Sequence, residues 1–213
     1  MSAKHYLITG ATSGIGKALL DYYSADPTAK VTAWSRSNGH DITKPAFDMP
    51  DNIDVLINCA GIAAMNFSTL MSASKALEIC NTNLVGVHNV CTAAFYKMRA
   101  HKHGRMINFS SIAAHLAIEG EAIYAASKAG VECLTRVLAK EYAAWGITVN
   151  CIAPGPIQTP MIAKVPEGKI NKIIQQQAVK RMATFADVIN LVNFFVREES
   201  SMVTGQTIVL GGV

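Results

Sequence analysis

Tyr124 and Lys128 are two ionisable side chains that stand four residues apart in a long stretch of helical composition. Side chains with this spacing share one face of a helix. A free tyrosine has a pKa of about 10 and is a poor acid or base at neutral pH. A neighbouring ammonium stabilises the phenolate and lowers this pKa, so the pair is suited to general acid–base chemistry. Taken alone, such a pair is common by chance and usually belongs to an exposed helix face.

A second candidate is the glycine-rich turn from Thr9 to Gly16, which reads Thr-Gly-Ala-Thr-Ser-Gly-Ile-Gly. The turn follows a predicted strand and opens a predicted helix, which is the context of a dinucleotide-binding site. Glycines let the backbone approach a pyrophosphate, and a helix N-terminus offers free N–H groups and partial positive charge. The spacing G-x-x-x-G-x-G differs from the common G-x-G-x-x-G, and an ordinary strand-to-helix turn is the alternative interpretation.

Ser35 and Arg36 stand at the end of the predicted second strand. An Asp or Glu at this place would hydrogen-bond a ribose 2′-hydroxyl, whereas an Arg can pair with a 2′-phosphate. The residues therefore favour NADP(H) over NAD(H). The alternative is that Arg36 is a solvated charge at a strand end.

The elements that must position these residues alternate between strands and helices. Apolar runs predict strands at residues 4–9, 31–35, 55–58, 105–110, 147–152 and 207–210. Helices are predicted at residues 15–24, 72–81, 84–101 and 121–145, and from Thr184 onward, with Asp187 completing a capping box. Such alternation indicates a mostly parallel sheet covered on both faces. We expect one α/β domain over residues 1–213, a doubly wound Rossmann-type fold.

The segment after the second strand is unusually short, because only residues 37–40 separate Arg36 from Asp41. A parallel crossover needs about a dozen residues or more, usually as a helix. We therefore predict a shortened sheet edge and six strands. Asn38-Gly39 could form a tight hairpin turn instead.

The composition is that of a globular protein, with 213 residues, 50% of them hydrophobic and 16% charged. No apolar run reaches the length of a membrane span and no signal peptide is recognisable, so we expect no membrane association and a cytoplasmic location. The five cysteines are scattered, which predicts reduced thiols and no metal site. The basic residues between Lys97 and Arg105 suit a helix C-terminus, and we expect no nucleic-acid binding.

The chain resembles the short-chain dehydrogenase/reductase family, through an ordered set of motifs that runs from Lys4 to the C-terminus. In chain order the motifs are Thr9-Gly10-x-x-x-Gly14-x-Gly16, Asp41, Asn58-Cys59-Ala60-Gly61, Asn83 in Asn-Leu-Val-Gly, Asn108-Phe109-Ser110-Ser111, Tyr124-Ala-Ala-Ser-Lys128, Asn150, Pro154-Gly155-Pro156-Ile157-Gln158-Thr159 and Thr204-Gly205-Gln206. One such motif could be accidental, but the whole set in this order is specific. The closing region resembles the subgroup related to 3-oxoacyl-[acyl-carrier protein] reductases.

The resemblance implies a catalytic tetrad of Asn83, Ser111, Tyr124 and Lys128. Ser111 is preferred over Ser110 because it precedes Tyr124 by thirteen residues, a common family spacing. Ser111 would hold the substrate carbonyl, Tyr124 would transfer the proton, Lys128 would lower the Tyr124 pKa and hold the nicotinamide ribose, and Asn83 would support a water chain.

The same resemblance implies contacts to the cofactor. The residues expected to make them are Thr9, Gly10, Thr12, Ser13, Gly14, Ile15, Gly16, Ser35, Arg36, Asp41, Asn58, Ala60, Gly61, Tyr124, Lys128, Pro154, Gly155, Ile157 and Thr159. Cys59 stands where the family often has a second Asn, and Ser13 where NADP-preferring members often have a basic residue. The shortened edge leaves the adenine contact of Asp41 open.

The implied function is NADP(H)-dependent hydride transfer with a small carbonyl or secondary alcohol, for example a 3-oxoacyl thioester. A short substrate lid is expected around residues 160–182. The resemblance also implies a homotetramer or homodimer, with one self-complementary face formed by the helices at 84–101 and 121–145 and another by the C-terminal strand. A non-catalytic redox sensor or structural subunit of the same fold is the alternative.

Overall fold

The apolar strands form one parallel sheet in a computed structural model that describes residues 3–44, 48–163 and 165–213. The strands are β1 (Lys4–Thr9), β2 (Ala29–Trp34), β3 (Val55–Asn58), β4 (Gly104–Phe109), β5 (Ile147–Ala153) and β6 (Thr207–Val209). Within the described residues the sheet has six strands in the order β2-β1-β3-β4-β5-β6, and every pairing is parallel. The predicted doubly wound fold is confirmed.

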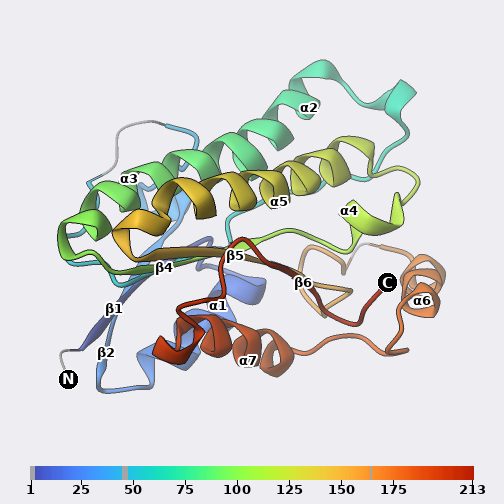
Figure 1. The fold of residues 1–213 in the computed structure, drawn as a ribbon. Helices are drawn as coiled ribbons and strands as arrows, with labels where there is room; N and C mark the ends of the chain where they lie inside the picture. The colour runs from blue at the N-terminus through green and yellow to red at the C-terminus, as the bar shows by residue number, and fades with distance from the viewer. Residues whose placement is uncertain (1–2, 45–47, 164) are drawn as a thin grey trace.

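Helices cover both faces of this sheet, as the buried strands require. The helices are α1 (Gly14–Ser24), α2 (Ala73–Cys80), α3 (Gly86–His101), α4 (Ala113–Leu116), α5 (Ala122–Tyr142), α6 (Glu167–Gln176) and α7 (Phe185–Val196). Figure 1 shows α3 and α5 on one face and α1 and α7 on the other, with α4 and α6 beyond one end of the sheet. None of the helices in the described ranges is long and apolar enough to span a membrane.

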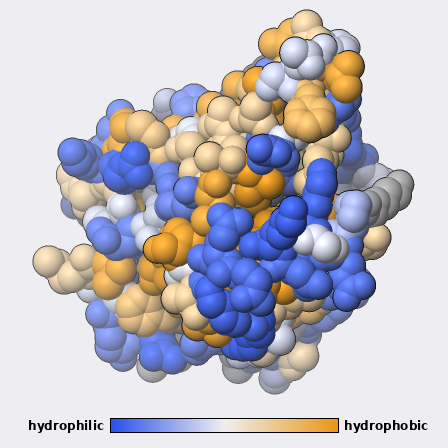
Figure 2. All heavy atoms as spheres, turned by 90° about the vertical axis from the view of Figure 1, so that its right-hand side faces the viewer, coloured by the Kyte–Doolittle hydropathy of each residue, from blue (hydrophilic) through white to orange (hydrophobic). Residues whose placement is uncertain are grey.

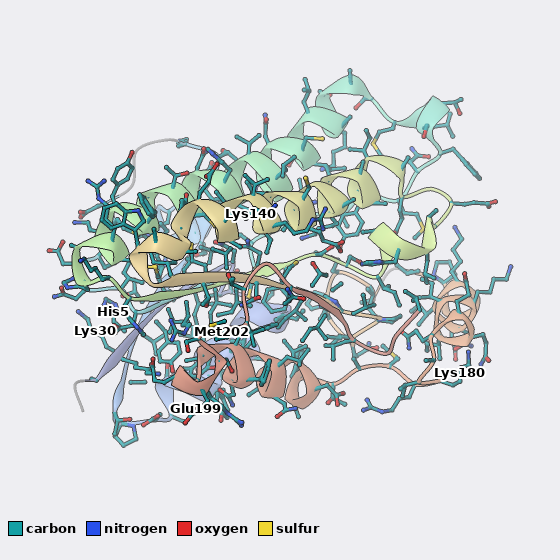
Figure 3. The ribbon with its side chains drawn as sticks, in the orientation of Figure 1. His5, Lys30, Lys140, Lys180, Glu199 and Met202 are labelled. Carbon is teal, nitrogen blue, oxygen red and sulfur yellow. The ribbon has the colours of Figure 1, made fainter. Side chains whose placement is uncertain are left out.

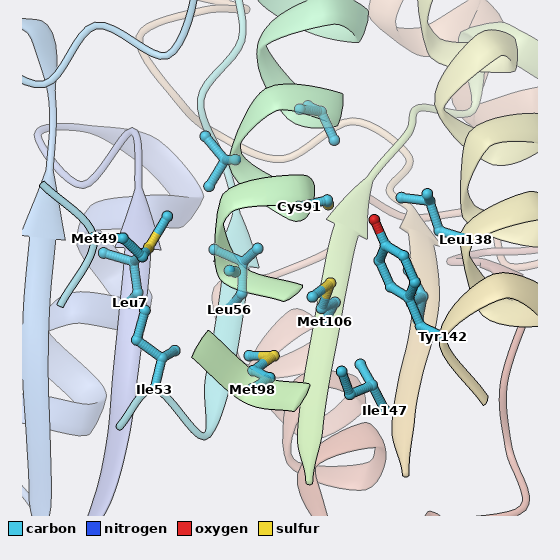
Figure 4. Close-up of a cluster of buried hydrophobic side chains, with 14 of the residues drawn as sticks. Leu7, Met49, Ile53, Leu56, Cys91, Met98, Met106, Leu138, Tyr142 and Ile147 are labelled. Carbon is cyan, nitrogen blue, oxygen red and sulfur yellow. The ribbon is translucent and has the colours of Figure 1, made fainter. Parts of the chain in front are cut away.

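The main core lies between the sheet and the helices α3 and α5 (Figure 4). Leu56 and Met106 from the strands meet Cys91 and Met98 from α3, and Tyr142 closes the layer from α5. Burying a side chain of this size contributes about 1.5–3 kcal/mol. A second cluster, which includes Ile8, Leu19 and Phe195, fills the opposite face.

The shortened edge follows β2, which is the outermost strand. The prediction of a hairpin at Asn38-Gly39 is wrong. Residues Arg36–Asn38 form a single 3-10 turn, and Gly39 ends it with a left-handed φ of 89°. The chain then turns inward, because Ile42 and Met49 are both buried in the main core. Residues 45–47 of this connection lie outside the described part.

The helices predicted at 72–81 and 84–101 are one continuous helical run rather than two separate elements. A π-helical segment, Asn81–Val85, joins α2 to α3 without a break. The side chain of Asn83 in this segment is tied to the backbone of Ile62, which gives a reason for the local widening. Such π-segments are frequent at functional sites.

Because all strands are parallel, their carboxyl ends meet at one edge of the sheet. The register pairs Thr9 with both Trp34 and Asn58, and it pairs Phe109 with Ile152. Ligands of open α/β sheets bind at this edge. In Figure 3, Lys180 lies beside α6 at this end, whereas His5 and Lys30 lie at the opposite end of the strands.

Candidate active site

The glycine-rich turn presents free backbone N–H groups at the N-terminus of α1. Ser13, the residue before the helix, makes no side-chain cap, so the first N–H groups of the helix remain open to a ligand. Gly10 has a φ of 67°, and a Cβ there would lie 2.7 Å from the Cα of Ala60. A Cβ on Gly16 would collide with the carbonyl oxygen of Gly10. The turn therefore packs closely only because these positions lack side chains.

A cavity of about 630 Å³ opens over this turn. Of the residues expected to contact the cofactor, those that line it are Gly10, Thr12, Ser13, Gly14, Ile15, Gly16, Ser35, Arg36, Asp41, Ala60, Gly61 and Thr159. Its size and its uncapped helix N-terminus suit a dinucleotide with a pyrophosphate. The residues present thus fit such a cofactor.

The end of the cavity near β2 holds one exposed cation. Arg36 is exposed at the start of the 3-10 turn, and it lines the cavity. The imidazole ring of His40 stacks on the indole ring of Trp34 with 4.7 Å between centroids. Asp41 lines the same end, and the hydrogen bond donated by the Thr43 hydroxyl holds the pKa of Asp41 below its usual range.

A second cavity of about 460 Å³ lies beside the first, and residues including Cys59, Gly61 and Thr159 line both. The predicted site residues that line the second cavity but not the first are Ser111, Tyr124, Lys128, Pro154, Gly155 and Ile157. Much of its remaining wall is apolar, with side chains such as Ile162, Ile170 and Ile173. Figure 2 looks onto this end of the molecule and shows hydrophobic surface lying between hydrophilic groups.

Tyr124 and Ser111 are brought together in this second cavity by the packing of α5 against β4. The Ser111 hydroxyl lies close enough to the Tyr124 phenol to act on its pKa. Burial raises the pKa of Tyr124 to about 12, and the Ser111 hydroxyl offsets only part of that rise. The phenol therefore keeps its proton at neutral pH.

Lys128 lies one turn further along α5 and is 6% exposed. Its Nζ donates a hydrogen bond of 2.8 Å to the carbonyl oxygen of Phe109 and lies 5.9 Å from the centroid of the Tyr124 ring. Burial lowers the pKa of Lys128 to about 8. Burial is the largest cause acting on the Tyr124 pKa, and Lys128 is not among the groups that shift it in this structure.

Asn83 is fully buried and does not line either cavity. Its Oδ1 accepts from the N–H of Ile62 at 2.8 Å, and its Nδ2 donates to the Ile62 carbonyl at 2.9 Å and to the Ser127 hydroxyl at 3.1 Å. In this arrangement Asn83 fixes the loop after β3 against the helix that carries Tyr124.

Thr9 and Asn58 also lie behind the cavity walls rather than along them. The Thr9 hydroxyl accepts from the N–H of Ala60 at 3.2 Å. Asn58 donates to Asn108 at 2.9 Å within the buried sheet. Both residues support the turns that line the first cavity.

The matching family model describes enoyl-(acyl carrier protein) reductases and covers residues 29–212. This match extends over most of the chain and establishes which family the chain is part of. The chain belongs to the short-chain dehydrogenase/reductase family.

Curated relatives and a solved structure agree with this membership. The chain is 32% identical to the 3-oxoacyl-[acyl-carrier-protein] reductase FabG of Thermotoga maritima, over 100% of the chain and 98% of that protein. It is 34% identical to acetoacetyl-CoA reductase of Shinella zoogloeoides, over 97% and 96%. The structure of ElxO with NADP bound matches with a TM-score of 0.82 and 25% identity, over 97% of this chain and 96% of that one. As a short-chain dehydrogenase/reductase, the protein is an NAD(P)-dependent oxidoreductase.

Two carboxylates of this short-chain dehydrogenase/reductase were not predicted. Glu121 lines the second cavity, and burial raises its pKa, which the nearby Lys169 partly offsets. Glu132 is buried behind Ser110. Their spacing was a usable signal, because Glu121 precedes Tyr124 by three residues and Glu132 follows Lys128 by four, which places each pair on one helix face.

Proposed function

We propose that this protein reduces a small 3-oxoacyl thioester, or oxidises the corresponding secondary alcohol, with NADP(H) as the hydride carrier. The observation that carries the proposal is the meeting of Ser111, Tyr124 and Lys128 in an apolar cavity that adjoins a nucleotide-sized one. The names of the reductases from Thermotoga maritima and Shinella zoogloeoides support the substrate class.

The proposed cofactor would be held by residues of both cavities. The N-terminus of α1 would bind the pyrophosphate, and Arg36 would pair with the 2′-phosphate. Ile157 and Thr159 would hold the carboxamide of the nicotinamide, and Lys128 its ribose. The bound nicotinamide supplies or accepts the hydride.

The chain's own residues would hold the carbonyl and move the proton. The Ser111 hydroxyl donates a hydrogen bond to the substrate carbonyl oxygen, which orients and polarises it. Tyr124 gives its phenolic proton to the oxygen as negative charge develops there. Its raised pKa keeps that proton available at neutral pH. The Lys128 ammonium then favours the phenolate that forms, and Asn83 holds the adjoining loop in place.

The substrate class follows from the wall of the second cavity. Ile162, Ile170 and Ile173 suit a hydrocarbon chain, whereas a sugar would leave hydroxyl groups without partners. Glu121 places a carboxyl group near Tyr124, which disfavours substrates with a carboxylate close to the carbonyl. A short, uncharged 3-oxoacyl group meets both conditions.

The proposal extends to the assembly and the compartment. The large apolar side chains exposed on the outer side of α2, α3 and α5 and at the end of α5 are Leu77, Val85, Tyr96, Val137 and Trp145. We expect them to bury against a second copy in a homodimer or homotetramer. All five cysteines are free thiols, which suits a reducing compartment such as the cytoplasm.

The test is NADPH oxidation by the purified protein with acetoacetyl-CoA, together with fluorescence titration of NADPH and NADH. The expected result is NADPH binding and thioester-dependent oxidation in the wild type. Tyr124→Phe should lose nearly all turnover while still binding NADPH. Turnover that survives in Tyr124→Phe would contradict the proposed proton transfer, and NADPH binding without turnover on any carbonyl would favour a redox sensor.

A further inference from the structure

The carboxylate of Glu132 is a buried acceptor that holds two different side chains. Glu132 lies on α5 and is 8% exposed. Its Oε1 accepts a hydrogen bond of 2.6 Å from the Ser110 hydroxyl. The same oxygen lies 2.9 Å from Nε2 of His115, which must donate because a carboxylate only accepts.

The two side chains held by Glu132 stand on either side of Ser111 in the sequence. Ser110 directly precedes it, and His115 belongs to α4, the single helical turn that follows it. The backbone N–H of Ala113 donates to the Ser111 hydroxyl at 3.2 Å, which links α4 directly to Ser111. One oxygen atom thus accepts hydrogen bonds from side chains on both sides of Ser111.

Glu132 also connects this segment to the helix of the other site residues. It follows Lys128 by four residues and Tyr124 by eight on α5. The Ser110 hydroxyl lies 3.1 Å from the Lys128 carbonyl, which brings the segment against the same turn of the helix. Glu132 thus ties the segment that carries Ser111 to the helix that carries Tyr124, in addition to the backbone hydrogen bonds from Ser110 to Ile152 and from Ile112 to Pro154.

We propose that Glu132 and His115 are positioning residues that hold Ser111 at hydrogen-bonding distance from Tyr124 and the substrate carbonyl. The inference rests on the proposed function for its kinetic part. Neither side chain lines either cavity, so both act through Ser111 rather than on the substrate. Catalysis is sensitive to such placement, because a displacement of about 1 Å can cost about 100-fold in rate.

Paired variants separate positioning from packing. Glu132→Met and His115→Leu keep much of the volume but remove the acceptor or the donor. We expect each to lower kcat on acetoacetyl-CoA by about 10- to 100-fold, with the NADPH dissociation constant unchanged within about twofold. Glu132→Gln and His115→Gln keep one acceptor oxygen or one N–H donor, and should recover most of the lost kcat. Glu141→Met, an exposed carboxylate on the same helix, is the matched control.

Backbone hydrogen exchange gives a second readout that needs no substrate. The N–H of Ile112 donates to Pro154 and that of Ala114 to Ser111, so both report on the segment. In Glu132→Met we expect these amides to exchange at least about tenfold faster, with exchange in β1 and α1 unchanged. A wild type that turns over no carbonyl would refute the proposed function alone, and the exchange rates would still test the tether. Unchanged exchange, or a kcat loss that neither Gln variant recovers, would overturn the inference.

Discussion

Lys128 is a buried ammonium, and the fold holds it at an energetic cost. Its Nζ donates to the Phe109 carbonyl, and among the residues that the structure describes it has no carboxylate partner to compensate for the lost hydration. Burial lowers its pKa to about 8 for this reason. A residue kept in this condition suits a role in the reaction better than a role in stability.

The cost of Lys128 should be visible as a pH dependence of stability. Below pH 8 the amine is charged in both the folded and unfolded states. Burying that charge destabilises the folded state. Between the folded pKa of about 8 and the ordinary value of 10.5, the unfolded chain binds more protons. Stability contributed by this group therefore rises with pH across that window.

Urea unfolding of the wild type and Lys128→Met at pH 7 to 10 tests this sign. Relative to the variant, the wild type should gain on the order of 2 kcal/mol as the pH rises through the window. Lys140→Met removes an exposed ammonium from the same helix and is the control; Lys140 is labelled in Figure 3. The prediction would be contradicted if the free energy of unfolding of the wild type, minus that of Lys128→Met, stayed constant or fell as the pH rises.

The proposed preference for NADP(H) rests on the side chain of Arg36. It is the exposed cation at the β2 end of the first cavity, and Ser13 supplies no second charge. Arg36→Ala should weaken NADPH binding about tenfold, the loss of one charge-assisted hydrogen bond, and leave NADH binding nearly unchanged. Titration of both nucleotides measures this. An equal loss for both would show that Arg36 does not recognise the 2′-phosphate.

At the scale of elements, the site depends on how closely the turn after β1 packs against α1 and the loop after β3. Gly10 approaches the backbone of Ala60, and Gly16 approaches the carbonyl of Gly10. These contacts aim the N-terminus of α1 at the cavity. The helix start is thus positioned by backbone contacts rather than by a capping side chain.

Two glycine substitutions test this packing. Gly16→Ala should destabilise the protein by about 1–3 kcal/mol and abolish measurable nucleotide binding, because the new methyl group has no room. Gly168→Ala in α6 has nothing within 4 Å of its Cβ and should be neutral or stabilise by up to about 1 kcal/mol. Thermal unfolding with and without NADPH distinguishes them. Normal NADPH binding by Gly16→Ala would refute the packing argument.

At the scale of the whole molecule, the shortened edge leaves β2 as the outermost strand, and Ile42, Met49 and Ile53 from the described parts of the following connection pack into the core. The opposite edge ends at β6, and Met202 in the turn before it is 91% exposed. Figure 3 places Met202 well away from the α5 residue Lys140. The proposed assembly can therefore use two separate faces of the molecule.

Sedimentation of two variants tests the proposed assembly. Val137→Glu places a charge on the outer side of α5, and Met202→Glu places one beside β6. If the protein is a tetramer, each variant should reduce it to a dimer; if it is a dimer, only one of them should yield monomers. A wild type that sediments as a monomer would refute the proposed assembly.

The sequence by itself determined the strands, their parallel arrangement and the residue types of the site. Apolar runs, the turn from Thr9 to Gly16 and the spacing of Tyr124 and Lys128 are local patterns, and each has one favoured local structure. The shortened edge was also predictable, because chain length limits what can be built between Arg36 and Asp41. The capping box of Thr184 and Asp187 was predictable because it is formed by residues only three positions apart.

Tertiary structure decided what each of these residues touches. Asn83 proved to be locked to Ile62, and Tyr124 acquired a raised pKa, because burial depends on segments far away in the chain. The hairpin at Gly39 was wrong because the core draws Ile42 inward. Glu132 and His115 are seventeen residues apart in the sequence. Only the packing of α4 on α5 brings the His115 ring to the same Glu132 oxygen that accepts from the Ser110 hydroxyl. Hydrogen bonds between distant segments leave no periodic trace in a sequence.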